Sequence, residues 1–361
     1  MKKVMLYPFD SASFSILKYK NRLNNLELVD IVSPIGWGYN DVYIKYLVRH
    51  DFSNALENCD IVWIVNSQNS ISYEYDIRPK IEEAVLKKKE VIVTRDFDEE
   101  KKQEIERIIK DNKYKFTNLC QTNSLKCLEN LEMDSLFEIN CPVIYIVGAM
   151  EYTKRYEMLL ALGESFKKKN LKTLLFTERQ EGTLMGCYDF SYMLKDDKVC
   201  EVEKIKNMNW YFKQMERNIN PDLIIAMAPG RLLTANSCCI ENSIINGYEL
   251  SYALQPDCII LSIMYTENLE NLIPELQEQC RRTYGFYADF INVVERMLDE
   301  SNGESGEGLS YLTLDEKFVT AHIGHIADQV SCLKDNESFE KLAQNIMAQL
   351  SRQKSKVFIM N

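Results

Sequence analysis

The fold is best read outward from one stretch of the sequence, Pro142-Val143-Ile144-Tyr145-Ile146-Val147-Gly148-Ala149-Met150-Glu151-Tyr152-Thr153-Lys154-Arg155. In it, an apolar run rich in β-branched residues ends at a glycine, and a short loop leads into a segment of helical periodicity. A buried strand, a glycine-containing loop and a helix in this order are typical of parallel α/β domains that present backbone N–H groups to an anion. The stretch therefore predicts a domain with the architecture of a phosphate-binding domain.

The spacing from Gly148 to Lys154 is that of a P-loop, G-x-x-x-x-G-K-[ST]. Two positions of the motif differ, because Thr153 replaces the second glycine and Arg155 replaces the residue whose hydroxyl binds Mg²⁺. Lys154 is the residue expected to neutralise phosphate charge. The motif leaves three interpretations open: a nucleotide-hydrolysing site, a site that binds a nucleotide or another anion without hydrolysis, and a vestigial loop.

Length and composition describe a globular protein and exclude some classes of partner. The chain has 361 residues, of which 46% are hydrophobic and 27% charged, so two domains with a core each are expected. The net charge of -11 argues against nucleic acid as a main partner. No apolar run is long enough to span a bilayer, and the first residues do not form a signal peptide. Eleven scattered cysteines suit reduced thiols, so a cytoplasmic protein is expected.

Apolar strand patterns alternate with helical patterns along the chain, which predicts an α/β fold with two doubly wound parallel-sheet domains. We expect a Rossmann-like domain over 1–138 and a P-loop-NTPase-like domain over 142–361. In the second domain we expect strands at 143–147, 172–177, 222–228, 257–263, 309–314 and 357–360. We expect helices at 154–169, 204–218, 320–331 and 337–351, and one long helix or two helices over 269–299. The last strand would leave an exposed edge, which would permit a homodimer.

The first domain lacks the fingerprint of a dinucleotide site. No G-x-G-x-x-G follows its first strand, and the loop there reads Pro8-Phe9-Asp10-Ser11-Ala12-Ser13. Ser11 and Ser13 are interpreted as helix N-caps, with phosphate contact as the less favoured alternative. A nicotinamide cofactor is not expected.

Ligands of parallel α/β sheets bind at the carboxyl ends of the strands, and polar residues follow four predicted strands of the second domain. The glycine-punctuated loop after the second of these strands suggests Glu178 or Asp189 as a magnesium ligand, and Arg179 or Arg231 as the partner of a phosphate or carboxylate. No catalytic residue is assigned and no metal site is predicted, because His322 and His325 alone are a weak zinc signal. The predicted ligand-binding residues are Gly148, Thr153, Lys154, Glu178, Arg179, Gln180, Gly182, Asp189 and Arg231.

Three pieces of the sequence carry a resemblance: Leu6-Tyr7-Pro8, the loop Val32-Ser33-Pro34-Ile35-Gly36-Trp37-Gly38, and the start of the second domain. Together they resemble a family of peptide-maturation-system proteins, encoded in cassettes for ribosomally made, radical-SAM-modified peptide natural products. The resemblance covers essentially the whole chain and implies a role in processing or exporting a modified peptide, but it identifies no catalytic residue. The second domain is separately similar to the P-loop-like domain of nucleotide-dependent enzymes of the dethiobiotin-synthetase class.

Two functions follow as hypotheses. The first is an accessory protein of peptide natural-product maturation, which binds a precursor peptide, a radical-SAM maturation enzyme or a small anionic ligand near the interdomain cleft. The alternative is a P-loop-type enzyme, an NTPase, ligase or kinase, that uses ATP or GTP with magnesium at Lys154.

Overall fold

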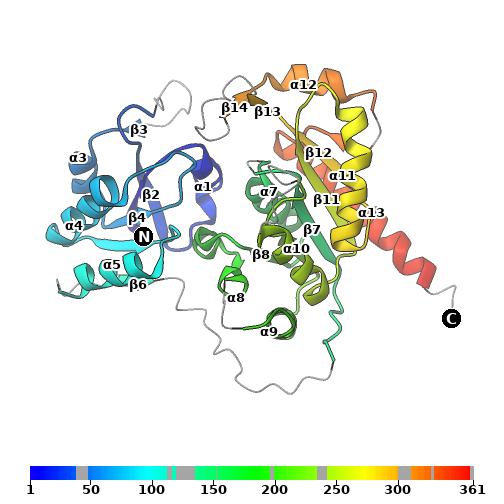
Figure 1. The fold of residues 1–361 in the computed structure, drawn as a ribbon, viewed down its shortest axis with the longest axis horizontal. Coiled ribbons are helices and arrows are strands. Elements are labelled where there is room, and N and C mark those ends of the chain that lie inside the picture. Colours follow the sequence, from blue (N-terminus) through cyan, green and yellow to red (C-terminus); the bar gives the residue numbers. More distant parts are fainter. Residues whose placement is uncertain are drawn as a thin grey trace. The chain divides into compact units, whose positions relative to one another are not determined.

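The computed structural model describes residues 1–37, 48–111, 116–118, 135–151, 153–195, 199–233, 242–299, 310–326 and 329–357. The chain divides into two compact units. The first unit comprises Met1–Cys127 and Arg179–Asp189, and the second comprises Leu128–Glu178 and Phe190–Asn361. Each unit is built around its own parallel sheet with helices around it, as Figure 1 shows, so the predicted fold class is confirmed.

The first unit contains a parallel sheet with the strand order β3-β2-β1-β4-β5-β6. Its strands are β1 (Lys2–Tyr7), β2 (Leu26–Val32), β3 (Val48–Arg49), β4 (Ile61–Ile64), β5 (Glu90–Val93) and β6 (Phe116–Asn118). Its helices are α1 (Phe14–Lys18), α3 (Phe52–Glu57), α4 (Arg78–Leu86) and α5 (Glu99–Asp111), with short turns η1 (Ser11–Ser13), η2 (Lys20–Arg22), η3 (Tyr73–Ile77) and η4 (Gln180–Met185). Since β1 neighbours both β2 and β4, the strand order reverses between β1 and β4, where Rossmann-like folds bind their ligands.

The central strands of this sheet are buried on both faces. All four residues of β4, Ile61–Ile64, are buried, which agrees with the continuous apolar run that parallel strands require. Trp63 is fully buried, and its Nε1–H donates a hydrogen bond of 2.9 Å to Thr94 Oγ1, so its polar atom is satisfied inside the core.

The second unit is built on a seven-stranded sheet in the order β15-β12-β11-β7-β10-β8-β9, in which β9 (Tyr188–Asp189) is the edge strand next to β8. The other six strands are parallel to one another. They are β7 (Val143–Gly148), β8 (Thr173–Thr177), β10 (Leu223–Met227), β11 (Cys258–Met264), β12 (Phe290–Val294) and β15 (Val330–Ser331). A two-stranded antiparallel ribbon, β13 (Arg296–Asp299) with β14 (Ser310–Thr313), follows β12. The stretch that began the sequence analysis is thus the central strand of this unit, between β11 and β10.

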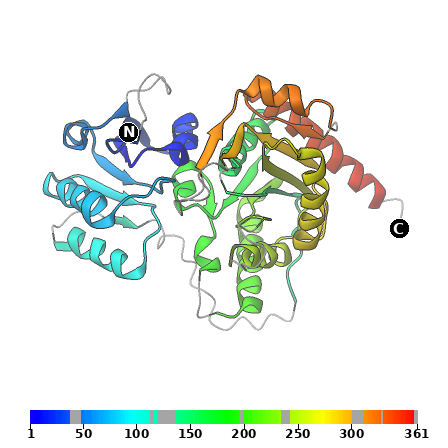
Figure 2. The same cartoon turned by 45° about the horizontal axis from the view of Figure 1, so that its top comes forward.

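Helices cover both faces of the second sheet (Figures 1 and 2). One face carries α7, which packs on α13, and the other carries α10, which packs on α9 and α11. The helices are α7 (Arg155–Lys168), α8 (Ser191–Leu194), α9 (Glu201–Ile219), α10 (Asn242–Ala253), α11 (Leu269–Tyr284), α12 (Glu316–Ile323) and α13 (Asn336–Val357). None of the described helices combines the length and the apolar character that crossing a membrane requires.

Three predictions for the last third of the chain are wrong. The helical stretch expected over 269–299 ends at Tyr284, because Gly285 adopts the left-handed conformation that terminates helices, and β12 and β13 follow. The helix expected over 320–331 is α12 followed by β15. Val357 ends α13 instead of beginning a strand, and residues 358–360 lie outside the described part of the chain, as does Gly38.

Candidate functional site

The loop after β7 has the predicted order of strand, loop and helix. β7 ends at Gly148, α7 begins at Arg155, and Lys154 is the N-cap residue of the helix. Lys154 has a left-handed backbone conformation, with φ 55° and ψ 25°. Residues other than glycine and asparagine rarely adopt this conformation. Those that do are concentrated at functional sites. The first backbone N–H groups of α7 follow Lys154 directly. These groups have no acceptor within the helix itself.

Gly148 is required by the close approach of protein side chains. A Cβ atom on Gly148 would lie 2.7 Å from both Cδ and Nε of Arg155, and 2.8 Å from Oγ1 of Thr153. The guanidinium of Arg155 continues to the end of β10, where Nη1 donates a hydrogen bond to the carbonyl of Ala228, and Nη2 lies 3.6 Å from the Glu178 carboxylate. Arg155 therefore joins the carboxyl ends of β7, β8 and β10, at the motif position of a magnesium-binding hydroxyl.

Lys154 forms an ion pair with Glu295, which follows β12. The Glu295 side chain is only 12% exposed, so burial raises the pKa of its carboxyl, but the Lys154 ammonium and its hydrogen bond outweigh burial and hold this pKa below its ordinary value. The pair thus keeps a largely buried carboxylate ionised at neutral pH. The ion pair connects the loop after β7 to the end of β12, and β11 lies between these two strands in the sheet.

A chain of buried hydrogen bonds fixes the backbone of this loop. Ser262 Oγ donates to the carbonyl of Thr153 at 2.6 Å, and Asn292 Nδ2 donates to Ser262 Oγ at 3.0 Å. Asn292 Oδ1 in turn accepts the backbone N–H of Leu333 at 2.9 Å. Ser262 and Asn292 are buried, as is Thr153, whose hydroxyl donates to the Met150 carbonyl at 3.2 Å. The loop is therefore held from below by β11 and β12, and its conformation is preorganised.

The loop after β10 lies against the same place. The N–H groups of Leu232 and Leu233 donate to the carbonyls of Gly148 and Ala149 at 3.1 and 2.9 Å. Arg231, with a 13% exposed side chain, lies 3.9 Å from the carboxylate of Glu151, which is 57% exposed. Within the second unit, the carboxyl ends of β7, β8 and β10 thus bring together five of the predicted ligand residues: Gly148, Thr153, Lys154, Glu178 and Arg231.

The donor set at this edge fits an anion better than a divalent cation. Lys154, Arg155 and Arg231 come from two loops, while Glu295, Glu178 and Glu151 are each in contact with one of these cations. Magnesium needs oxygen ligands that are not already neutralised. Across the described part of the chain, no group of three or more His, Cys, Asp or Glu side chains could hold a metal ion. Glu178, one of the two residues suggested as a magnesium ligand, is thus paired with Arg155 instead.

The other four predicted ligand residues belong to the first compact unit. Arg179, Gln180, Gly182 and Asp189 belong to the segment Arg179–Asp189, which packs on the strand ends of that unit. Arg179 pairs with the fully buried Glu181, and its Nη2 donates to the Ala12 carbonyl at 3.3 Å. Two further bonds complete the attachment, from Gln180 Nε2 to Asp96 Oδ1 at 3.3 Å and from Arg22 Nε to the Met185 carbonyl at 3.0 Å.

A buried carboxylate occupies the reversal point of the first sheet. Asp10 follows β1, and its oxygens accept the N–H groups of Ala12, Gln68 and Asn69 at 2.8, 2.5 and 3.0 Å. Burial raises the pKa of Asp10, while these N–H groups and Arg179 act in the opposite direction. Asp10 also caps η1, a role predicted for Ser11 and Ser13, whereas Ser11 Oγ bonds Gln68 Oε1 at 2.6 Å. An aspartate thus takes the backbone donors that a phosphate would use in a dinucleotide site.

The two histidines have protein partners. His322 Nδ1 lies 2.7 Å from the Phe318 carbonyl, and His325 Nε2 lies 3.3 Å from the Glu270 carboxylate. His322 lies in the last turn of α12 and His325 in the turn that follows, and each has a protein contact at one ring nitrogen.

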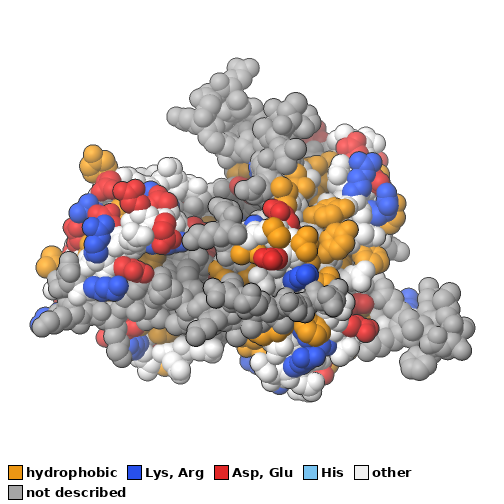
Figure 3. Space-filling view, turned by 60° about the horizontal axis from the view of Figure 1, so that its bottom comes forward, with side chains coloured by type: hydrophobic (Ala, Val, Ile, Leu, Met, Phe, Trp, Pro, Cys, Tyr) orange, Lys and Arg blue, Asp and Glu red, His pale blue; other side chains and the backbone are white. Residues whose placement is uncertain are grey.

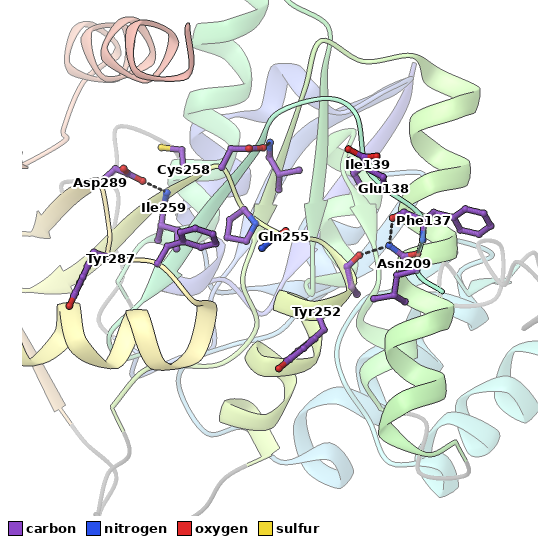
Figure 4. Close-up of a pocket in the computed structure, with 16 residues that line it drawn as sticks. Phe137, Glu138, Ile139, Asn209, Tyr252, Gln255, Cys258, Ile259, Tyr287 and Asp289 are labelled. Carbon is purple, nitrogen blue, oxygen red and sulfur yellow. Dashed lines mark hydrogen bonds between the residues drawn. The ribbon is translucent and has the colours of Figure 1, made fainter. Parts of the chain in front are cut away.

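A cavity of about 790 Å³ lies at the opposite, amino-terminal edge of the second sheet (Figure 4). Phe137, Tyr252 and Tyr287 are among its lining residues, and Asn209 closes one wall by bonding the backbone of Phe137 in both directions, at 2.7 and 2.9 Å. Asp289, near the start of β12, accepts the N–H of Ile259 at 2.8 Å. The Asn209 and Asp289 side chains that line this cavity are thus already bonded to the protein backbone.

Three residues that hold the loop after β7 were not predicted from the sequence: Glu295, Ser262 and Asn292. Glu295 and Asn292 fell inside a segment interpreted as helix, although the run Phe290-Ile291-Asn292-Val293-Val294 is a short apolar stretch suited to a buried strand. Ser262 is a single hydroxyl inside a buried strand, and a polar residue at such a position signals a partner in the core.

Comparisons with known proteins agree with this architecture. No protein-family model matches the chain, and no curated protein matches its sequence. Among solved structures, the chain is similar to a DUF1611 family protein from Anabaena variabilis, with a TM-score of 0.60 and 12% identity over 91% of this chain and 93% of that one. Weaker likenesses are to cobyrinic acid a,c-diamide synthase from Mycobacterium smegmatis with a bound ATP analogue and magnesium (TM-score 0.36, 7% identity, 59% of this chain and 96% of that one) and to the cell division protein MinD of Aquifex aeolicus (0.34, 12%, 58% and 98%). At such identities the first likeness concerns the fold alone, and the other two are too distant to bear on function.

Proposed function

We propose that the second unit binds the phosphate groups of a nucleotide at the carboxyl ends of β7 and β10, and that it does so without hydrolysing the nucleotide. One observation carries the proposal: Lys154 and Arg155 place two cations at the N-terminus of α7, and Arg231 adds a third from the loop after β10. A helix N-terminus is positively charged, so cations are unfavourable there and an anion is favourable.

The backbone of Lys154 supports the same conclusion. A left-handed conformation at a residue other than glycine costs roughly 1 kcal/mol or more, and the buried network through Ser262 and Asn292 holds the loop in place. A bound phosphate would offset this cost, because it would accept hydrogen bonds from backbone N–H groups of the first turn of α7 and would neutralise the cations.

Binding would exchange one anion for another at these cations. Arg231 and Glu151 are 3.9 Å apart and Glu151 is mostly exposed, so this weak contact is the easiest for a phosphate to replace. The Lys154–Glu295 pair is more buried and competes more strongly with the ligand. Lys154 thus binds phosphate more weakly than an unpaired P-loop lysine would.

Arg155 is the reason for proposing binding without hydrolysis. A P-loop enzyme holds Mg²⁺ through the hydroxyl at this position, whereas Arg155 is bonded to the Ala228 carbonyl and faces Glu178. The enzyme alternative, an NTPase, ligase or kinase, would need a different metal site.

The role in peptide natural-product maturation stays a prediction, together with its precursor-peptide or radical-SAM-enzyme partner. A unit that binds a nucleotide without consuming it would suit an accessory protein, since binding can report nucleotide supply or change the affinity for a partner.

The test is thermal unfolding of the full chain with ATP, GTP and inorganic pyrophosphate, each with and without Mg²⁺. A ligand at about 100 times its dissociation constant stabilises by about 2.7 kcal/mol, which is readily visible as a higher Tm. We expect a shift with the nucleotides, loss of that shift in Lys154→Ala, and no phosphate release over hours.

The matched control is Lys168→Ala, which removes the same charge from the other end of α7 and breaks an exposed pair with Glu340 at 2.6 Å. This variant should keep the full shift. If no nucleotide or pyrophosphate raises the Tm of the unaltered protein, or if Lys154→Ala and Lys168→Ala shift alike, the proposed function is wrong.

A further inference from the structure

A second cavity, of about 490 Å³, lies between α9 and α10 in the second unit. Its apolar walls come from Leu136, Val202, Ile205, Ile245, Tyr248 and Tyr252. Several of these side chains reach the surface, and hydrophobic side chains gather on this side of the unit (Figure 3). The volume is within the usual range for small-molecule sites, roughly 300–1,000 Å³.

Glu249 of α10 lines this cavity and is only 3% exposed. Its Oε2 is buried and has no hydrogen-bond partner among the described residues. A buried carboxylate without a donor is costly, since its hydration is lost and not replaced. A ligand that brings a donor into the cavity would supply what the protein leaves out.

The charges around Glu249 favour a cationic donor. Glu201 of α9 also lines the cavity and acts on Glu249 as a like charge, and Lys206 of α9 lines it as a cation. Burial raises the pKa of Glu249 and Lys204 of α9 acts in the opposite direction, but no described cation forms an ion pair with the Glu249 carboxylate. Glu249 is the most deeply buried of the three charged residues that line the cavity, and its buried Oε2 has no donor. A ligand that brings both a donor and a positive charge therefore satisfies this carboxylate better than a neutral group does.

Aromatic rings complete the surroundings. The rings of Tyr248 and Tyr252 are 5.6 Å apart between centroids and both line the cavity. Aromatic faces attract ammonium groups through their quadrupole, and cages of aromatic side chains are a common means of binding amines. A carboxylate beside two tyrosines thus matches an ammonium group attached to an apolar body.

We propose that the cavity between α9 and α10 binds a small organic amine, whose ammonium group pairs with Glu249 between Tyr248 and Tyr252 while its apolar body contacts Ile205 and Ile245. This site is independent of the proposed nucleotide site, because the two share no residue. Lys154→Ala should therefore leave amine binding unchanged, and failure of one proposal does not imply failure of the other.

The test is calorimetric titration of the full chain with 2-phenylethylamine, compared with 2-phenylethanol, which has the same body and no charge. We expect the amine to bind at least tenfold more tightly than the alcohol. Glu249→Gln keeps the shape of the side chain and removes its charge, and should weaken amine binding at least tenfold while leaving the alcohol unaffected.

Glu203→Gln is the matched control, since it removes the same charge from the exposed surface of α9 and does not line the cavity. It should bind the amine like the unaltered protein. Val202→Trp, at a lining position that is 61% exposed, should block both ligands by filling the entrance. Equal binding of amine and alcohol, an equal effect of Glu249→Gln and Glu203→Gln, or no binding at all would overturn the proposal; the Tm of each variant verifies that it is folded.

Discussion

The side chain of Arg155 lies over Gly148 so closely that the glycine has no room for a Cβ atom, which would be 2.7 Å from Cδ and Nε of the arginine. Gly148 thus makes room for the Arg155 side chain of the same protein, whereas the glycine of a P-loop makes room for a phosphate. The residue that departs most from the motif is also the one that keeps its first glycine necessary.

Gly148→Ala should lower the free energy of unfolding by about 1–3 kcal/mol, because the added methyl group overpacks a fully buried position. Urea unfolding measures the loss. Gly324→Ala is the control, since a Cβ there would meet its nearest atom, the Thr320 carbonyl oxygen, at an ordinary 3.5 Å. In an Arg155→Ala background, Gly148→Ala should cost less free energy of unfolding than it does in the unaltered protein, because the arginine side chain that the methyl group meets is gone. If Gly148→Ala costs the same in both backgrounds, the contact is not the source of the loss.

Lys154→Ala should cost about 2 kcal/mol at pH 7, since it leaves Glu295 ionised and partly buried without its partner. The lowered pKa of Glu295 makes the pair stabilising above the usual pKa of a glutamate, and this contribution is lost as pH falls through the folded-state value. The difference between the two proteins should therefore be largest at neutral pH and shrink toward about pH 3. Urea unfolding at a series of pH values tests this, and a difference independent of pH would show that the pair is not its source.

Glu295→Gln should tighten nucleotide binding several-fold, because it removes the carboxylate that competes with phosphate for Lys154. Calorimetric titration with ATP measures the change, and Glu340→Gln, which frees Lys168 at the far end of α7, should have no effect. Weaker binding in Glu295→Gln would mean that Glu295 positions Lys154 for the ligand and does not compete with it.

Asp10→Asn should destabilise the first unit by about 2 kcal/mol or more, since an amide cannot accept from three backbone N–H groups and one of its own N–H groups would oppose them. Hydrogen exchange should accelerate at Ala12, Gln68 and Asn69. Asp98→Asn serves for comparison, because Asp98 is an exposed cap that accepts the N–H of Lys101 at 2.9 Å and should cost less. Equal losses would show that burial of Asp10 adds nothing.

The order of strands and helices was predictable wherever a long helix followed a strongly apolar run. β7, its glycine and α7 were placed correctly because the period of the apolar residues changes from continuous to helical at Gly148. The same method failed at β12, because a five-residue apolar strand that follows a helix closely resembles a continuation of that helix. Gly285 was the available signal for the helix end.

The contacts of the candidate site were much less predictable. Lys154 and Glu295 are 141 residues apart, and neither local pattern contains information about the other. Thr153 and Arg155 were visible as departures from a motif, but their partners Ser262 and Ala228 depend on strand order and register, which a single sequence does not specify.

The placement of Arg179–Asp189 has a consequence for how the gene can be divided. The chain leaves the second unit after Glu178, completes the first unit and returns at Phe190, so neither unit is encoded by one continuous stretch. A recombination event or a cloning boundary near residue 140 would separate the first unit from the residues that bond to Ala12, Asp96 and Arg22. Homologous exchange of a whole unit would need three crossovers, and we expect the two halves of this protein to be inherited together.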